Sequence, residues 1–468
     1  MLAGLALGTL LAIAVWGFLR RPSPSQKLPI AGQRFPLGFL WGAAEDAFQH
    51  EGGNTQNDWH AWIHQSPSPI DRGATYALGT NFWQRWREDF QRAKDDGHTA
   101  HRFGLEWSRL EPAPGRYDEA AWAQYERMVR ACKEEMGFVT FVNLWHYTLP
   151  LWASRAGGWE NPTTLERFEA MVAEAARRLG PWVDRWSTMI DAQLYPLAGY
   201  LAGQIPPHQK SLRRARAMFA TMLAVHARAY RVLHALDVKD FNGAPKRSSV
   251  GQIYFFTALT PRGLLLDRLV CRHLDHLFNW ALLDALVLGK SDIAMVPWLD
   301  AGKRPALEPA TTLDWLGVNY FTRRVVEVVP GRSPLDFERR QVRWPVSDMN
   351  WEIFPQGIYE LLIRISMRHP GLPLYITENG LADERDDRRP EFIVDHLAFA
   401  HKAIEQGAAL QGYFHWSLTD NWEWALGSWP RFGLYRVDAE SGDRVRTASA
   451  ELFAEIARSN RLPDQRRR

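Results

Sequence analysis

Two carboxylates in this chain of 468 residues stand where short apolar runs end. Asp191 directly follows the run 185–190, and Glu378 closes the run 372–378. A buried carboxylate costs free energy unless it is paired or takes part in chemistry. Two carboxyl groups that flank one bond can cleave a glycoside, because one protonates the leaving oxygen while the other attacks the sugar carbon or activates water. Asp191 and Glu378 are therefore candidates for this pair of roles.

Other side chains suited to binding a sugar also follow apolar runs. Aromatic rings bind the C–H face of a sugar, whereas amide, imidazole and carboxylate groups bind its hydroxyls. One polar residue at a strand end is ordinary, because strand ends meet water. A set this rich in Arg, His, Trp and carboxylate groups is better explained by a site. Its members are Gln49, Arg102, His146, Asn319, Tyr320, Trp416, Glu423 and Trp424.

The elements that would position these residues alternate along the chain. Amphipathic helical stretches such as 82–97 and 390–407 separate short β-rich runs. Strands that alternate with helices predict parallel βαβ units, and eight of them close a (β/α)8 TIM barrel. The active site of such a barrel lies at the carboxyl ends of its strands. The eight runs are 39–44, 99–104, 138–143, 185–190, 250–255, 313–320, 372–378 and 411–418.

Composition narrows the class of protein. The chain is 46% hydrophobic and 23% charged, which is typical of a globular protein and excludes a disordered or fibrous one. A net charge of +3 is too small to indicate a nucleic-acid partner. The two cysteines, Cys132 and Cys271, match no metal or redox spacing, and His60 and His64 are a typical surface pair. We therefore expect neither a metal nor a cofactor.

The first residues differ from the rest. Residues 1–18 are apolar and uncharged, and Arg20, Arg21 and Lys27 follow them. This pattern predicts an uncleaved, single-pass transmembrane helix with the following domain on the cytoplasmic side, although a cleaved signal peptide stays open. The expected organisation is an anchor over 1–19, a linker over 20–34, one α/β barrel domain over 35–459 and a basic tail over 460–468.

Several motifs follow one another in an order known from one enzyme family. They are "FPLGFLWGAAEDAFQHEG", "HRFGLEWSRLEP", "NLWHYTLPLWA", "GYLAGQIPP", "LGVNYFTR", "YITENG", "WSLTDNWEWALG" and "RFGLYRVD". With these motifs, residues 35–457 resemble glycoside hydrolase family 1, the β-glucosidase and β-galactosidase family of (β/α)8 barrels. Chance agreement of so many motifs in the same order is negligible.

The resemblance implies roles for individual residues. Glu378 matches the catalytic nucleophile, Tyr320 the tyrosine that hydrogen-bonds it, and Arg102 the arginine that keeps it ionised. A nearby cation has this effect because it lowers the pKa of a carboxyl. The residues that match the sugar-binding positions, or follow the same strand ends, are Gln49, His146, Asn319, Trp416, Glu423 and Trp424.

The acid/base motif departs from the family pattern. The family has Thr-x-Asn-Glu-Pro where this chain has "TMIDA" at 188–192. Asp191 therefore stands in place of the acid/base Glu, and Ile190 in place of the Asn that binds the sugar's 2-hydroxyl. Aspartate is shorter than glutamate by about 1.5 Å. Retaining enzymes hold the two carboxyls about 5–5.5 Å apart, so the shorter side chain should weaken a proton transfer that is typically worth ~10²–10⁴-fold in rate.

Three further carboxylates are unusual for the family. Glu45 and Asp46 replace small hydroxyl residues at the end of the first strand, where either could place a carboxylate in the pocket. Pairing with Arg102, or exposure to solvent, is the simpler expectation for both. Glu106 is best interpreted as half of a structural pair.

The leading hypothesis is a retaining β-glycosidase that acts on β-glucosides or β-galactosides. Glu378 would form a covalent glycosyl-enzyme, and Asp191 would be a weakened acid/base. Two alternatives are glycosyl transfer to membrane glycolipids and a non-catalytic, sugar-binding barrel. The sequence leaves the sugar, the aglycone, the balance of hydrolysis and transfer, and the oligomeric state open.

Overall fold

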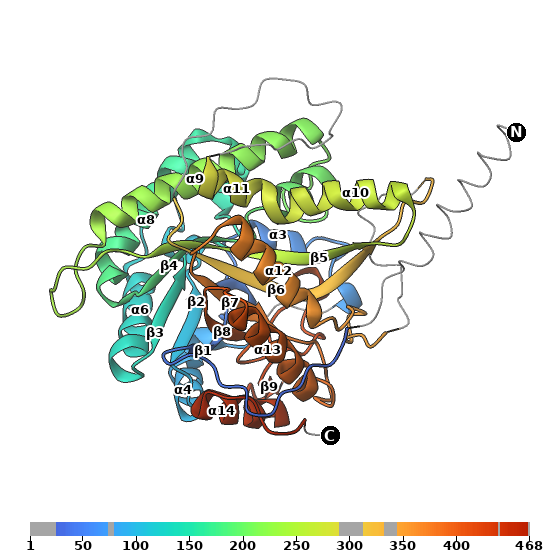
Figure 1. Ribbon diagram of the computed structural model, residues 1–468. Coiled ribbons are helices and arrows are strands. Elements are labelled where there is room, and N and C mark those ends of the chain that lie inside the picture. Colours follow the sequence, from blue (N-terminus) through green and yellow to red (C-terminus); the bar gives the residue numbers. More distant parts are fainter. Residues whose placement is uncertain (1–24, 74–78, 290–311, 332–343, 439, 467–468) are drawn as a thin grey trace, which may run out of the picture.

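Eight parallel strands form a closed barrel in sequence order, with β1 beside β8 (Figure 1). The computed structural model describes residues 25–73, 79–289, 312–331, 344–438 and 440–466. The predicted (β/α)8 TIM barrel is confirmed. Its strands are β1 (Leu40–Ala44), β2 (Ala100–Gly104), β3 (Val139–Asn143), β4 (Arg185–Ile190), β5 (Val250–Pro261), β6 (Trp315–Val326), β7 (Leu374–Asn379) and β8 (Leu410–Trp416).

The strands are buried along nearly their whole length. Every residue of β2 and β7 is buried, as expected for parallel strands covered on both faces. Strands β5 and β6 are 12 residues each, and their pairing continues to Pro261 and Val326. Among their buried charged residues are Arg102 in β2 and Glu378 in β7.

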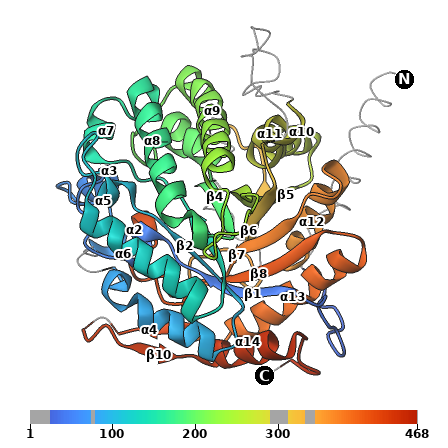
Figure 2. The same ribbon diagram turned by 90° about the vertical axis from the view of Figure 1, so that its left-hand side faces the viewer.

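Helices surround the barrel on the outside (Figures 1 and 2). Side-chain caps fix several helix starts: Asn161 accepts a hydrogen bond from the backbone of Thr163, and Pro162 then opens α8. The helices are α2 (Ala47–His50), α3 (Asp58–Ile63), α4 (Phe82–Asp95), α5 (Trp107–Leu110), α6 (Glu119–Arg130), α7 (Leu151–Arg155), α8 (Pro162–Leu179), α9 (Leu212–Leu236), α10 (Leu265–Asp275), α11 (Ala281–Leu288), α12 (Gln356–Arg368), α13 (Arg389–Glu405) and α14 (Ala448–Ser459).

Segments from the two ends of the described chain lie side by side. The backbone N–H of Leu462 donates to the carbonyl of Gln33 at 2.9 Å, and Phe35 N–H donates to the carbonyl of Asn460 at 3.0 Å. The side chain of Leu462 is fully buried. We call residues 33–35 and 460–462 the terminal clasp. A small antiparallel sheet of β9 (Tyr435–Val437) and β10 (Arg444–Arg446) precedes α14.

The structure corrects the prediction of a transmembrane anchor, and with it the expected membrane-anchored location and membrane partner. Crossing the hydrocarbon core takes about 20 consecutive apolar residues in a helix. Within the parts of the chain that the structure describes, no helix is both long and apolar enough. The longest of these helices, α9, carries arginines along its length. Residues 1–19, on which the prediction was based, lie outside the described residues.

Candidate active site

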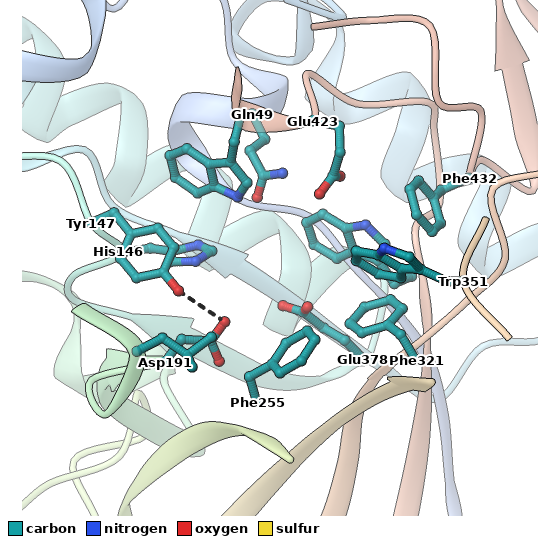
Figure 3. Close-up of a pocket in the computed structure, with 13 residues that line it drawn as sticks. Gln49, His146, Tyr147, Asp191, Phe255, Phe321, Trp351, Glu378, Glu423 and Phe432 are labelled. Carbon is teal, nitrogen blue, oxygen red and sulfur yellow. Dashed lines mark hydrogen bonds between the residues drawn. The ribbon is translucent and has the colours of Figure 1, made fainter. Parts of the chain in front are cut away.

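A cavity opens at the carboxyl ends of the strands. Asp191 follows β4, His146 follows β3, Glu378 lies in β7, and Gln49 lies in α2. Figure 3 shows that Asp191 and Glu378 both point into this cavity, with Gln49 and Glu423 near each other at another side of it. The barrel thus brings together side chains that are far apart in the sequence.

A buried cation holds the predicted nucleophile. The side chain of Arg102 is fully buried, and its Nη2 donates to Glu378 Oε1 at 2.5 Å. Burial raises the pKa of Glu378, the charge of Arg102 opposes that rise, and the charge of Asp191 adds to it. Burial also raises the pKa of Asp191. The charge of Arg102 lowers the pKa of both carboxyls, but its hydrogen bond goes to Glu378 and favours the ionised form of that side chain.

Both carboxylate oxygens of Asp191 have hydrogen-bond donors. Asn319 Nδ2 lies 3.3 Å from Oδ1, and the hydroxyl of Tyr147 lies 3.4 Å from Oδ2. The backbone of Asp191 has φ +54°, in the left-handed region that non-glycine residues rarely adopt. Such a conformation costs about 1–3 kcal/mol and persists only where the surroundings enforce it.

The residues predicted to bind the sugar have polar atoms to spare. Gln49 Nε2 donates to the carbonyl of Trp422 at 3.1 Å, while its Oε1 is buried with no hydrogen-bond partner among the described residues. His146 Nε2 likewise has no hydrogen-bond partner among the described residues. Buried polar atoms are nearly always hydrogen-bonded, so these two are suited to ligand hydroxyls. Glu423 lines the cavity and accepts from Asn421 at 2.7 Å.

Asp46 contacts both Arg102 and His146, and its pairing with Arg102 was expected. Asp46 Oδ2 is 3.5 Å from Arg102 Nη1 and 3.0 Å from His146 Nδ1. Burial raises the pKa of Asp46, but His146 and Arg102 outweigh that effect and hold it below its usual value. Arg102 therefore contacts two carboxylates at once, and its single charge is shared between them.

The other unusual carboxylates and the histidine pair lie outside this cavity. Glu45 pairs with His101 at 3.1 Å, and Glu106 accepts from the hydroxyl of Ser108 at 2.6 Å. The rings of His60 and His64 stack 4.0 Å apart. Among the described residues, no group of three or more His, Cys, Asp or Glu side chains is arranged to hold a metal ion.

The structure corrects the position predicted for Tyr320. Its hydroxyl donates to the carbonyl of Phe354 at 2.7 Å, away from the cavity. Neighbouring residues of a strand face opposite sides, so Asn319 and Phe321 face the site while Tyr320 faces the surrounding helices. Phe321 lines the cavity. Asn319 reaches Asp191, as described above, but is not itself part of the cavity wall.

An aromatic wall, formed by Phe255, Phe321, Trp351 and Phe432, completes the cavity (Figure 3). The rings of Phe255 and Phe321 stack 5.6 Å apart, and Phe321 also contacts Trp351 and Phe432. Sequence reasoning missed this wall, and it missed Tyr147. The alternation along β6 could have revealed Phe321, whereas Trp351 and Phe432 lie in loops that carry no such signal.

A family model described as glycosyl hydrolase family 1 matches residues 31–462. The chain belongs to this family. A β-galactosidase of Pyrococcus woesei is 31% identical, over 91% of this chain and 97% of that protein. A solved β-glycosidase from Pyrococcus horikoshii is 32% identical, with a TM-score of 0.80, over 93% of this chain and 97% of that one.

A family 1 β-glucosidase from Thermotoga maritima, solved in complex with isofagomine lactam, has a TM-score of 0.83 at 27% identity, over 92% of this chain and all of that one. Together with the family match, these relatives confirm the predicted family and the prediction of an O-glycosyl hydrolase, a β-glycosidase.

Proposed function

We propose that this family 1 protein is a retaining β-glycosidase in which Glu378 forms a covalent glycosyl-enzyme and Asp191 is the acid/base. The observation that carries the proposal is the bond from buried Arg102 to Glu378, with Asp191 facing the same cavity. One carboxylate is thereby kept ready to attack while the other retains a proton. This is the division of labour that a double displacement requires.

In the first step, the ionised carboxylate of Glu378 attacks the anomeric carbon. The bond from that carbon to the leaving oxygen breaks, and the proton held by Asp191 passes to the leaving oxygen. In the second step, Asp191 is ionised and takes a proton from water, whose oxygen displaces Glu378 from the sugar. The two inversions give net retention.

The substrate class is a β-glucoside or β-galactoside. Its motivation is the free Oε1 of Gln49, the free Nε2 of His146 and the carboxyl of Glu423, which can bind hydroxyls on one face of a sugar. Trp416 and Trp424 line the cavity beside them and offer apolar rings to the C–H face. Relatives of the chain are named for both sugars.

The proposal is tested by trapping the glycosyl-enzyme. A 2-fluoro glycoside with a good leaving group needs the nucleophile but little acid assistance. We expect a mass increase that maps to Glu378 in the wild type, and none in Glu378→Gln. Proton NMR of early product should show the β-anomer. An inverted product, or turnover by Glu378→Gln at the wild-type rate, would contradict the proposal.

A further inference from the structure

The predicted acid/base has a short side chain, and neither of its oxygens is free. Asp191 Oδ1 accepts from Asn319 and Oδ2 faces the hydroxyl of Tyr147. The donor that faces Oδ2 is the phenol of Tyr147, and the same residue lines the cavity. Of the two donors, only Tyr147 has a group that can both accept and donate a proton.

Tyr147 is held rigidly by other aromatic rings. Its ring lies 5.1 Å from Trp424 in an edge-on arrangement, and it stacks with Tyr195 at 6.4 Å and with Trp59 at 6.3 Å. These contacts fix the hydroxyl toward Asp191, as Figure 3 shows. A preorganised hydroxyl loses little freedom when a reaction begins.

The backbones at both partners are strained. Tyr147 has φ +60° and Asp191 has φ +54°. A bulky residue in this region is a genuine outlier, and such strain clusters at functional sites. The separation of 3.4 Å between the two side chains is long for an O–H···O bond. Catalytic hydrogen bonds are often long without substrate and tighten when it binds.

We propose that Tyr147 is a catalytic residue that relays the proton between Asp191 and the glycosidic oxygen. In glycosylation, the carboxylic O–H of Asp191 transfers its proton to the oxygen of Tyr147, while the phenolic proton of Tyr147 passes to the leaving oxygen. The carbon–oxygen bond breaks with its electron pair on that leaving oxygen, and Glu378 forms the new bond to carbon. In deglycosylation, water gives a proton to Tyr147, which returns its own to Asp191.

The electrostatics agree with this relay. Burial raises the pKa of Asp191, so the carboxyl has a proton to give. Burial, together with the charges of Asp191 and Glu378, raises the pKa of Tyr147 well above its usual value, so the phenol stays neutral between transfers. The hydroxyl extends the reach of the shortened acid. This inference rests on the retaining mechanism proposed above.

The test is a leaving-group series with Tyr147→Phe, which removes one oxygen atom and keeps the ring. The values of kcat/KM for aryl glycosides report the glycosylation step. We expect Tyr147→Phe to lose about 10²-fold or more with phenyl glycosides, which need acid assistance, and to equal the wild type with dinitrophenyl glycosides, which do not. The same change at Tyr254, a buried tyrosine away from the cavity, should leave the whole series unchanged.

A second variant separates a relay from a merely structural role. Asp191→Glu restores the missing methylene, so its carboxyl should reach the leaving oxygen directly. In that background, Tyr147→Phe should cost little with any leaving group. A loss that is equal for phenyl and dinitrophenyl glycosides, or one that persists in the Asp191→Glu background, would overturn the relay. Failure of the retaining mechanism would show differently, as Glu378→Gln with undiminished activity on dinitrophenyl glycosides.

Discussion

At the scale of single residues, charge balance decides what the site can do. Asp46, Asp191 and Glu378 share the neighbourhood of one buried arginine, Arg102. The charge of Asp46 raises the pKa of both Asp191 and Glu378. The proposed mechanism requires one proton on that pair, so Asp46 would move the range of active protonation states toward higher pH.

Replacing Asp46 with Asn should therefore shift the pH profile. Without the negative charge, the pKa of Asp191 and that of Glu378 both fall, and both limbs of kcat/KM against pH move to lower pH. His146 loses its carboxylate partner, so KM should rise as well. Rates measured with a phenyl glycoside across pH 4–9 would check this, with the exposed Asp443→Asn as the control. A profile that keeps its position, or moves to higher pH, would contradict the assignment.

The sequence predicted some of these residues and not others. Asp191 and Glu378 could be found because each closes an apolar run, and strand ends converge in a parallel barrel. Tyr147 could not be found, because its hydroxyl lies next to Asp191 only when the folded barrel places the ends of β3 and β4 side by side. The prediction for Tyr320 was wrong because a motif gives the residue type, whereas the pleat of β6 decides which side the residue faces.

At the scale of elements, a buried carboxylate ties the site loop to the barrel. Glu106 caps α5 through the backbone N–H of Ser108, and it accepts from the hydroxyl of Thr148 at 3.1 Å. Thr148 directly follows the loop residues His146 and Tyr147. Burial raises the pKa of Glu106 from its usual value to about 7. The loop that carries Tyr147, the proposed relay, is thus held by a hydrogen bond from Thr148 to an ionisable group, Glu106.

The variant Glu106→Gln should reveal this as a change of stability with pH. A raised folded-state pKa stabilises the native state below about pH 4.5, and that contribution is lost as pH rises through about 7. An amide does not ionise and has no such loss. The Tm of Glu106→Gln relative to wild type should therefore increase between pH 5 and pH 8. With the exposed Glu440→Gln, the difference should stay flat, and a flat difference for Glu106→Gln would refute the expectation.

Most elements could be predicted from periodicity. The run 185–190 matches β4 in both bounds, and the helical stretch 82–97 covers α4. Strands β5 and β6 extend beyond their predicted runs, which end at 255 and 320. Their extra residues pair with each other, and no local signal in either strand indicates that pairing.

At the scale of the whole molecule, the terminal clasp joins segments that are more than 420 residues apart in the sequence. The backbones of Arg34 and Arg461 pair as an isolated antiparallel β-bridge. Trp41 Nε1 in β1 donates to Asn460 Oδ1 at 2.9 Å. From the sequence alone, residues 33–34 are expected in a linker and residues 460–462 in a basic tail, whereas Phe35 opens the expected barrel domain. Only the closed barrel brings them together.

We expect the clasp to contribute measurably to stability. Leu462→Ala deletes a fully buried side chain and should lower the free energy of unfolding by about 2–5 kcal/mol. Urea unfolding followed by tryptophan fluorescence would measure the loss. The matched control is Leu37→Ala, because Leu37 is fully exposed and should tolerate the change. Equal midpoints for the two variants would show that the clasp is dispensable.

The pairing of β1 with β8 also sets when the enzyme can first work. On the ribosome, Gln49 emerges early, whereas Glu378 and Glu423 follow only after most of the chain has been made. Synthesis proceeds at roughly 5–20 residues per second, so β1 waits tens of seconds for the strand that it must meet. During that time, its edge has no β8 to pair with. The catalytic cavity is thus among the last features to appear, and a prematurely terminated chain cannot possess it.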